Sequence, residues 1–314
     1  YVRICGAGTL VIIAYNLIGS VFRGIGDSIT PLVTVAIACV CNIAGDLLLV
    51  AVFHMGTVGA AIATVLSQML ACVLTFVFLR RQKTESFLPQ GRDYRVDGRY
   101  GGLIIKTGLP SALQSLIVFF TVLVVTSMIN DYGLVASAAY GIGVKIESFN
   151  TMIRQAIAGS SAMIVAQNAG AGLTDRVRKT IRSAALVAFA VGLFMFGLVQ
   201  LFPREIAGLF HPSEDIAQEC VTFLHIVSIN YLYTGLMGVF NSLAIGIGFT
   251  QFAMFNSFTD SVIARLGLCY LFGTVLHMGL TGIYWGLALA PAVAAIIGFL
   301  YYKSNTWIKR KSLV

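Results

Sequence analysis

Nine apolar segments, each about twenty residues long or longer, dominate this chain of 314 residues. A helix of about 20 apolar residues, rising 1.5 Å per residue, crosses the roughly 30 Å hydrocarbon core of a bilayer. Only 11% of the residues are charged, whereas a soluble domain carries about 25%. The pattern therefore predicts an all-α polytopic membrane protein. Its expected spans are about 4–22, 31–53, 57–79, 104–129, 134–167, 183–202, 220–245, 250–275 and 279–302.

The formal net charge of +8 comes from short segments between the spans, which is typical of topological signals and not of nucleic-acid binding. Lys and Arg concentrate in 80–106, 168–182 and 303–311. Of the segments expected on the opposite side, 54–56, 130–133 and 276–278 contain no Lys or Arg, and 203–219 contains only Arg204 against four acidic residues. Because cytoplasmic loops are enriched in these residues, we expect the linker and the C-terminus to be cytoplasmic and the protein to lie in the plasma (inner) membrane.

Sequence motifs for catalysis are missing from this chain. The six cysteines lack metal-site spacing, and there is no HExxH, GxSxG or Walker motif, so we expect neither an enzyme nor a cofactor. A membrane-embedded enzyme or an assembly protein is the non-transport alternative.

An internal repeat organises the chain. "RGIG" (23–26) matches "AIGIG" (244–248), and "HMGTVG" (54–59) matches "HMGLTG" (277–282), at offsets of 222 and 223. Both copies run through three spans in the same direction, which indicates a parallel repeat. We expect a partial first bundle over 1–85, a cytoplasmic linker over 86–101 and a complete second bundle over 102–314. The repeat also predicts about three further spans before Tyr1, so that nine of twelve are present.

Several stretches resemble the multidrug and toxic compound extrusion (MATE) transporters. They are "YNLIGSVFRGIGDSITPL" (15–32), "MGTVGAAIATVLSQ" (55–68), "KTGLPSALQSLI" (106–117) and "IVAQNAGAGLTDRVRKTIRSA" (164–184). The resemblance implies two six-helix bundles around a central cavity, and a protein that is monomeric at full length. It also implies export of small organic, often cationic, compounds by alternating access, in antiport with H⁺ or Na⁺.

The resemblance also suggests a branch of the family. The NorM-type branch carries a Glu in its seventh helix shortly after a Gly-Leu-Pro, but Leu116, Ile117 and Val118 occupy that region here. This departure favours the DinF-like branch, in which the first bundle holds the coupling ion. The positions that match its ion site are Asn42, Asp46 and Thr64. A further acidic ligand would lie on a helix before Tyr1.

The residues themselves support such a site. Asn42 and Asp46 are four apart, so they share one helix face. Asp46 and Thr64 are each nine residues from Met55, which predicts similar depths on two antiparallel helices. Their oxygens suit Na⁺, and the carboxylate alone suits a proton. The alternative is that these side chains only bond neighbouring helices.

Other polar residues interrupt the second half. Lys145 and Glu147 are two apart and do not share a helix face, whereas Asp260 and Arg265 are five apart and can pair directly or through neighbouring helices. We expect ion pairs that shape or gate an aqueous cavity more than substrate contacts, and we expect Gln114 to line that cavity. The rival transport function is a lipid-linked oligosaccharide flippase, for which several cationic cavity residues are expected.

Overall fold

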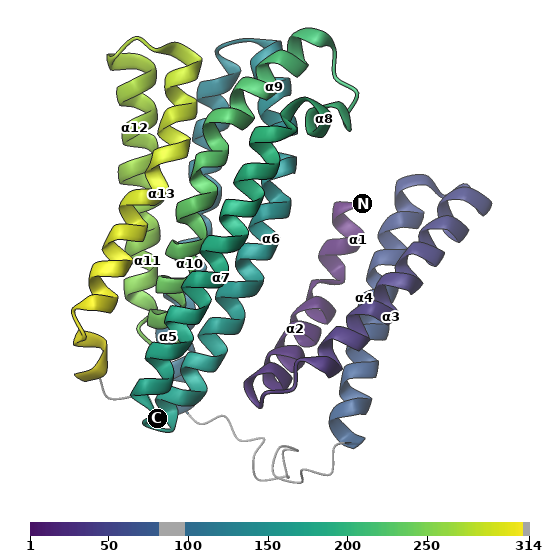
Figure 1. Ribbon diagram of the computed structural model, residues 1–314. Helices are drawn as coiled ribbons and strands as arrows, with labels where there is room; N and C mark the ends of the chain where they lie inside the picture. Colours follow the sequence, from purple (N-terminus) through teal and green to yellow (C-terminus); the bar gives the residue numbers. More distant parts are fainter. Residues whose placement is uncertain (82–97, 310–314) are drawn as a thin grey trace. The chain divides into compact units, whose positions relative to one another are not determined.

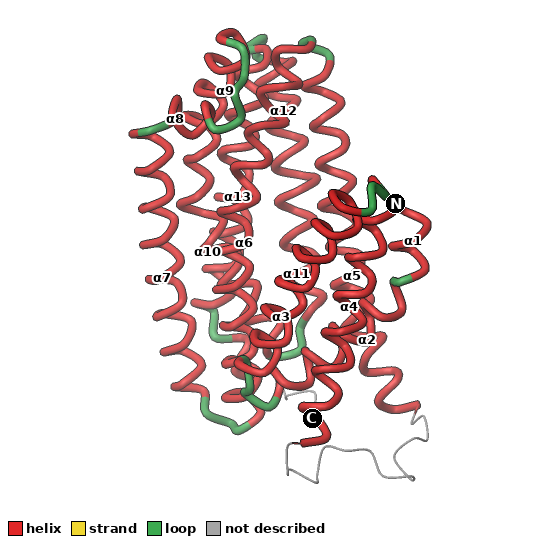
Figure 2. The backbone as a smooth tube through the Cα atoms, turned by 90° about the vertical axis from the view of Figure 1, so that its right-hand side faces the viewer, coloured by secondary structure: helices red, strands yellow, loops and turns green. Residues whose placement is uncertain are grey.

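The computed structural model describes residues 1–81 and 98–309, and these residues are helical throughout apart from short turns (Figures 1 and 2). They form two compact units, Tyr1–Asp97 and Gly98–Val314. Most of the predicted linker, 86–101, and the end of the basic C-terminal tail lie outside the described residues. The helix that opens the second unit begins at Gly98, so the last four residues assigned to the linker are helical.

The first unit contains four helices and a π-helical segment. Its elements are α1 (Val2–Ala7), α2 (Thr9–Gly24), α3 (Ile29–Asp46), η1 (Leu47–Val52) and α4 (Gly56–Arg81). α1 and α2 together occupy the first predicted span, and α3 continues directly into η1 to complete the second. α4 packs against α1, α2 and α3, so it is the central helix of this unit.

The second unit is a bundle of six membrane-length segments, several of them built from two or more consecutive helices (Figure 1). α10 lies against α6, α7 and α13, and ten of its 16 residues are buried. The elements are α5 (Gly98–Asn130), α6 (Leu134–Gly170), α7 (Thr174–Leu201), α8 (Pro203–Gly208), α9 (Glu214–Val227), η3 (Ser228–Asn230), α10 (Tyr231–Gly246), α11 (Thr250–Phe258), η4 (Thr259–Leu266), α12 (Gly267–Tyr270), η5 (Leu271–Val275), α13 (Gly279–Lys303) and η6 (Thr306–Lys309).

All nine predicted spans coincide with helical segments. Among the described residues, seven helical segments are long and apolar enough to cross a membrane. The other two predicted spans fall short for identifiable reasons. α2 alone has only 16 residues. α6 is 37 residues long but carries Lys145, Glu147 and Arg154 near its middle.

The internal repeat is visible in the backbone. Gly26 and Gly248 both have positive φ, 92° and 78°, in the turn before a span. In the hairpin after that span, His54 and His277 have φ of 53° and 54°. A non-glycine residue seldom adopts this left-handed conformation. Its recurrence at an offset of 223 therefore supports the parallel repeat at the level of the backbone.

Hydrogen bonds and helix contacts repeat in the same register. The Met55 amide donates to the Leu49 carbonyl at 2.9 Å, and the Met278 amide donates to the Phe272 carbonyl at 3.1 Å. The acceptor of the first bond lies in the π-helical segment η1, and the acceptor of the second lies in η5. A Cβ at Gly59 would lie 3.0 Å from Leu49, and one at Gly282 would lie 2.5 Å from Phe272. The two hairpins thus share three features: the turn, the π-helical segment before it, and a glycine at which the returning helix comes close to the preceding one.

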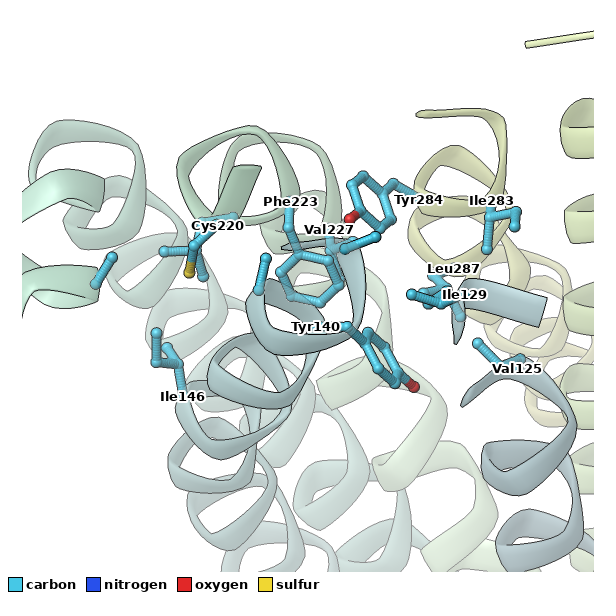
Figure 3. Packing of buried hydrophobic residues seen from close by; sticks show 14 of the residues in the cluster. Val125, Ile129, Tyr140, Ile146, Cys220, Phe223, Val227, Ile283, Tyr284 and Leu287 are labelled. Carbon is cyan, nitrogen blue, oxygen red and sulfur yellow. The ribbon is translucent and has the colours of Figure 1, made fainter. Parts of the chain in front are cut away.

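A buried aromatic cluster packs the upper part of the second unit (Figure 3). The Phe223 ring meets Tyr140 edge-on with centroids 5.8 Å apart, and it meets Tyr284 edge-on at 5.1 Å. Such edge-to-face contacts add about 0.5–1.5 kcal/mol per pair beyond area burial. They join α6, α9 and α13, so the position of Phe223 fixes how these three helices approach one another.

Gly143 of α6 makes room for the Phe223 ring, because a Cβ at this position would lie 2.2 Å from the ring. We therefore expect Gly143→Ala to destabilise the protein by about 1–3 kcal/mol, the typical cost of overpacking. Gly141→Ala is the matched control, because a Cβ there would meet no atom within 4 Å. Thermal unfolding in detergent compares the two variants, and equal melting temperatures would contradict this packing argument.

Candidate functional site

Asn42 and Asp46 lie on the last turns of α3, four residues apart and both half-buried. The Nδ2 atom of Asn42 and the Oδ1 atom of Asp46 are buried and have no hydrogen-bond partner among the described residues. Leaving a buried polar atom unpaired costs about 1–3 kcal/mol, and more for a charged group. The π-helical segment η1 begins directly after Asp46, and such widened turns are frequent at functional sites.

α4 comes close to this part of α3. A Cβ at Gly45 would lie 3.1 Å from the Cβ of Ala63, so the two helices nearly touch next to Asp46. Thr64 follows Ala63 directly and is half-buried, and its hydroxyl donates to the Ala60 carbonyl at 2.9 Å. The hydroxyl oxygen keeps lone pairs that can accept a hydrogen bond or bind a cation. The structure thus places the predicted residues at neighbouring levels of one helix pair, and their role stays a prediction.

Asp260 and Arg265 form an ion pair in the second unit. The Arg265 Nη2 atom donates to Asp260 Oδ2 at 3.0 Å, and the side chains are 25% and 6% exposed. In an ordinary α-helix, two residues that are five positions apart point to nearly opposite faces. Asp260 and Arg265, however, both lie on the π-helical segment η4. A π-helix bonds each residue to the fifth one along, which brings these two side chains together.

Glu147 of α6 joins this pair to a larger group of polar side chains. Its Oε1 atom accepts a hydrogen bond of 3.2 Å from Asn230 Nδ2, and its carboxylate interacts electrostatically with Arg154 and Arg265. We call Glu147, Arg154, Asn230, Asp260 and Arg265 the C-terminal polar cluster. The formal charges of its two acidic and two basic side chains add up to zero. A cavity of about 10 Å³ beside Arg154 is close to the size of one water molecule.

The sequence did not single out Arg154 or Asn230. Arg154 lies seven residues after Glu147 on α6, and a spacing of two helical turns is a signal that sequence reasoning can use. Asn230 gave no such signal, because it is 83 residues from Glu147 and lies in the short 3₁₀ turn η3. Only the packing of α6 against the η3 region brings the two side chains together.

Lys145 and Gln114 lie apart from this cluster. The Lys145 ammonium group is exposed and lies 5.8 Å from the centre of the Phe210 ring, so Lys145 and Glu147 point in different directions, as their spacing predicts. Gln114 of α5 donates a hydrogen bond of 2.7 Å to the Ser257 hydroxyl of α11. This contact makes Gln114 at least partly a link between helices, and its place at a cavity remains an expectation.

The sequence model of the MatE family matches residues 110–271, just over half of the chain. The chain belongs to the MatE family. This assignment confirms the family expected from the motifs, and it makes the chain a multi-pass membrane protein of a transporter family and not an enzyme. The matched region runs from α5 into η5 and includes every member of the C-terminal polar cluster.

Curated relatives extend the MatE similarity to both units. A probable multidrug resistance protein, YpnP of Bacillus subtilis (strain 168), is 27% identical over 310 residues, which are 98% of this chain and 68% of that protein. The probable multidrug resistance protein NorM of Thermotoga maritima is 23% identical and also matches over 68% of its own length.

Solved MATE structures share the fold. One of them, described as the outward-facing conformation of a multidrug resistance MATE family transporter of the MOP superfamily, has a TM-score of 0.92 at 22% sequence identity. It covers 99% of this chain, which in turn covers 70% of that one. The all-α polytopic architecture expected from the sequence is therefore confirmed.

Proposed function

We propose that this protein is a secondary active multidrug exporter, which moves small organic, often cationic, compounds in antiport with H⁺ or Na⁺. Its family and the names of its relatives favour this class of cargo. The observation that carries the coupling mechanism is the unpartnered, half-buried carboxylate oxygen of Asp46 within a long apolar span. An ionisable group at such a place is costly, so it usually marks an ion or proton pathway.

In the proposed mechanism, Asp46 is the residue that binds the coupling ion. Asn42 lies one turn before it and supplies an amide oxygen, while Thr64 on α4 supplies a hydroxyl oxygen. A proton needs only the carboxylate, whereas Na⁺ needs hard oxygen ligands beyond these three side chains. Binding of either ion changes the local charge at Asp46 from negative to neutral. It thereby shifts the balance between two arrangements of the first bundle and drives alternating access.

The orientation of the protein follows from its charges. Arg176, Arg178, Lys179 and Arg182 lie at the start of α7, and Lys303 lies at the end of α13. Under the positive-inside rule, these ends face the cytoplasm and the His54 and His277 hairpins face outward. We propose the plasma (inner) membrane as the location and a monomer as the functional state.

The test is transport in proteoliposomes with the two gradients imposed separately. With the protein at its natural length, we expect one of the two gradients, of protons or of sodium ions, to drive an outward flux of an organic cation. Ethidium is the cation that is followed. The gradient that drives the flux identifies the coupling ion. Flux that is independent of both gradients would contradict secondary active transport. Movement of an anionic lipid-linked oligosaccharide in place of ethidium would instead support the flippase alternative.

A further inference from the structure

An open groove of about 440 Å³ lies on the second unit between α7, α10 and α13. Among the described residues, its lining is apolar and partly aromatic, with one charged exception, Arg182. Its larger apolar wall residues are Ile181, Leu186, Phe189, Leu236, Phe240 and Phe299, and Ala185 also lines it. Leu186, Phe189 and Phe299 are 72%, 44% and 47% exposed within the described residues. The groove is thus a concave, hydrocarbon-like surface at one end of the bundle.

A cationic site adjoins the polar end of this groove. Arg182 is exposed and lies one turn after Arg178 on the same face of α7. Arg178 Nη2 donates to Asn305 Oδ1 at 3.2 Å, but its Nε atom is buried and has no partner among the described residues. Neither arginine has a described carboxylate within ion-pair distance. Two arginine charges that no described carboxylate neutralises therefore lie beside or within an apolar groove.

We propose that the groove binds an anionic phospholipid of the surrounding bilayer. The phosphate contacts Arg178 and Arg182, and one acyl chain lies along α7 from Arg182 towards Phe189. Those seven residues rise about 10 Å, most of the roughly 15 Å depth of one hydrocarbon leaflet. Arginine suits a phosphate because its fork-shaped guanidinium donates two parallel hydrogen bonds. In the proposed orientation, this lipid belongs to the cytoplasmic leaflet.

The chain contains a reporter for this lipid. Trp307 is buried and stacks on Tyr302, which lines the groove, with ring centroids 6.4 Å apart. Trp285 is the other of the two tryptophans in these 314 residues, so Trp285→Phe leaves Trp307 as their single tryptophan. Acyl chains brominated near the headgroup quench tryptophan only at short range. Quenching of Trp307 in nanodiscs therefore reports a chain in the groove.

The test compares brominated phosphatidylglycerol with brominated phosphatidylcholine at equal mole fraction in the Trp285→Phe protein. We expect phosphatidylglycerol to quench at roughly tenfold lower mole fraction, as two arginines near anionic headgroups allow. Arg178→Gln and Arg182→Gln should each reduce this preference. Arg176→Gln is the matched control, because it removes the same charge from another face of α7. Ala185→Phe should reduce quenching by filling the groove, whereas Ala190→Phe, at an exposed position outside the lining, should not.

Other occupants give different results. Equal quenching by both lipids, unchanged by Arg178→Gln and Arg182→Gln, means that the groove holds any acyl chain, and this overturns headgroup recognition. A second copy of the protein in the groove would exclude both lipids and double the mass measured by light scattering in detergent, which also overturns the proposal. Loss of transport without any change in the lipid preference would concern the proposed exporter mechanism and leave the lipid site intact.

Discussion

Replacing Asp46 with asparagine should abolish gradient-driven efflux while leaving the protein folded and inserted. The change removes the only acidic side chain between Ile29 and Arg81 but keeps its size. Because Asp46 Oδ1 has no described partner, no hydrogen bond to another described residue is lost through that atom. An amide can neither exchange a proton nor supply a negative charge to Na⁺. We therefore expect active efflux to fall by at least about tenfold, with equilibrium exchange of substrate less affected.

Two measurements separate coupling from folding in this experiment. Drug accumulation in cells reports net efflux, and substrate counterflow in vesicles without an ion gradient reports whether the carrier still cycles. Asp131→Asn is the matched control, because Asp131 is exposed in the turn after α5 and the change is chemically identical. Thr64→Val tests the third member of the site and should give a partial loss. Wild-type efflux by the Asp46→Asn protein would contradict the coupling assignment.

The second large effect concerns the buried ion pair. Asp260→Ala should destabilise the second unit by about 3 kcal/mol, because Arg265 would keep its charge at a mostly buried place without its partner. Replacing both residues with leucine should recover much of that loss, since apolar residues of similar volume often substitute well for a buried pair. Thermal unfolding in detergent measures both variants. A double variant as unstable as Asp260→Ala would mean that Arg265 also compensates the charge of Glu147.

An exposed ion pair provides the control for this experiment. Arg204 and Glu214 also form an ion pair, but their side chains are 64% and 74% exposed. Glu214→Ala should cost less than about 1 kcal/mol, because water screens such pairs and solvates the remaining charge. Transport by the stable double variant then tests whether the Asp260–Arg265 pair contributes more than stability.

The helical spans could be predicted from the sequence almost completely, because each one needs a long apolar run and ends at a turn residue or a charge. The turns were equally visible, since the glycines at 26 and 248 and the histidines at 54 and 277 repeat at offsets of 222 and 223. The local hydrogen bonding was harder to predict. No residue pattern in 259–266 indicates a π-helix, and only this geometry brings Asp260 directly to Arg265.

The candidate sites differ in how far the sequence could reach. Asn42 and Asp46 are four residues apart on one helix, so their spacing alone predicted that they lie close together. Thr64 was expected near them because it is as far from the hairpin centre, Met55, as Asp46 is. The Glu147–Asn230 contact depends on how α6 meets the η3 region, which no local pattern encodes. The groove beside Arg182 could not be predicted either. Its walls come from three helices, and periodicity alone does not show which faces of these helices lie next to one another.

The helix crossing beside Asp46 has a counterpart in the repeat, and the two differ in which helix contributes the glycine. In the first unit Gly45 lies on the helix of Asp46 and meets Ala63 of the returning helix. In the second unit the returning helix supplies Gly286, where a Cβ would lie 2.5 Å from the Cys269 amide nitrogen. Cys269 is the repeat equivalent of Asp46, and it is completely buried. The first copy of the hairpin thus carries a half-buried carboxylate, whereas the second copy is closely packed at the equivalent position. An aspartate transplanted to position 269 would therefore meet a packed backbone and not a second binding site.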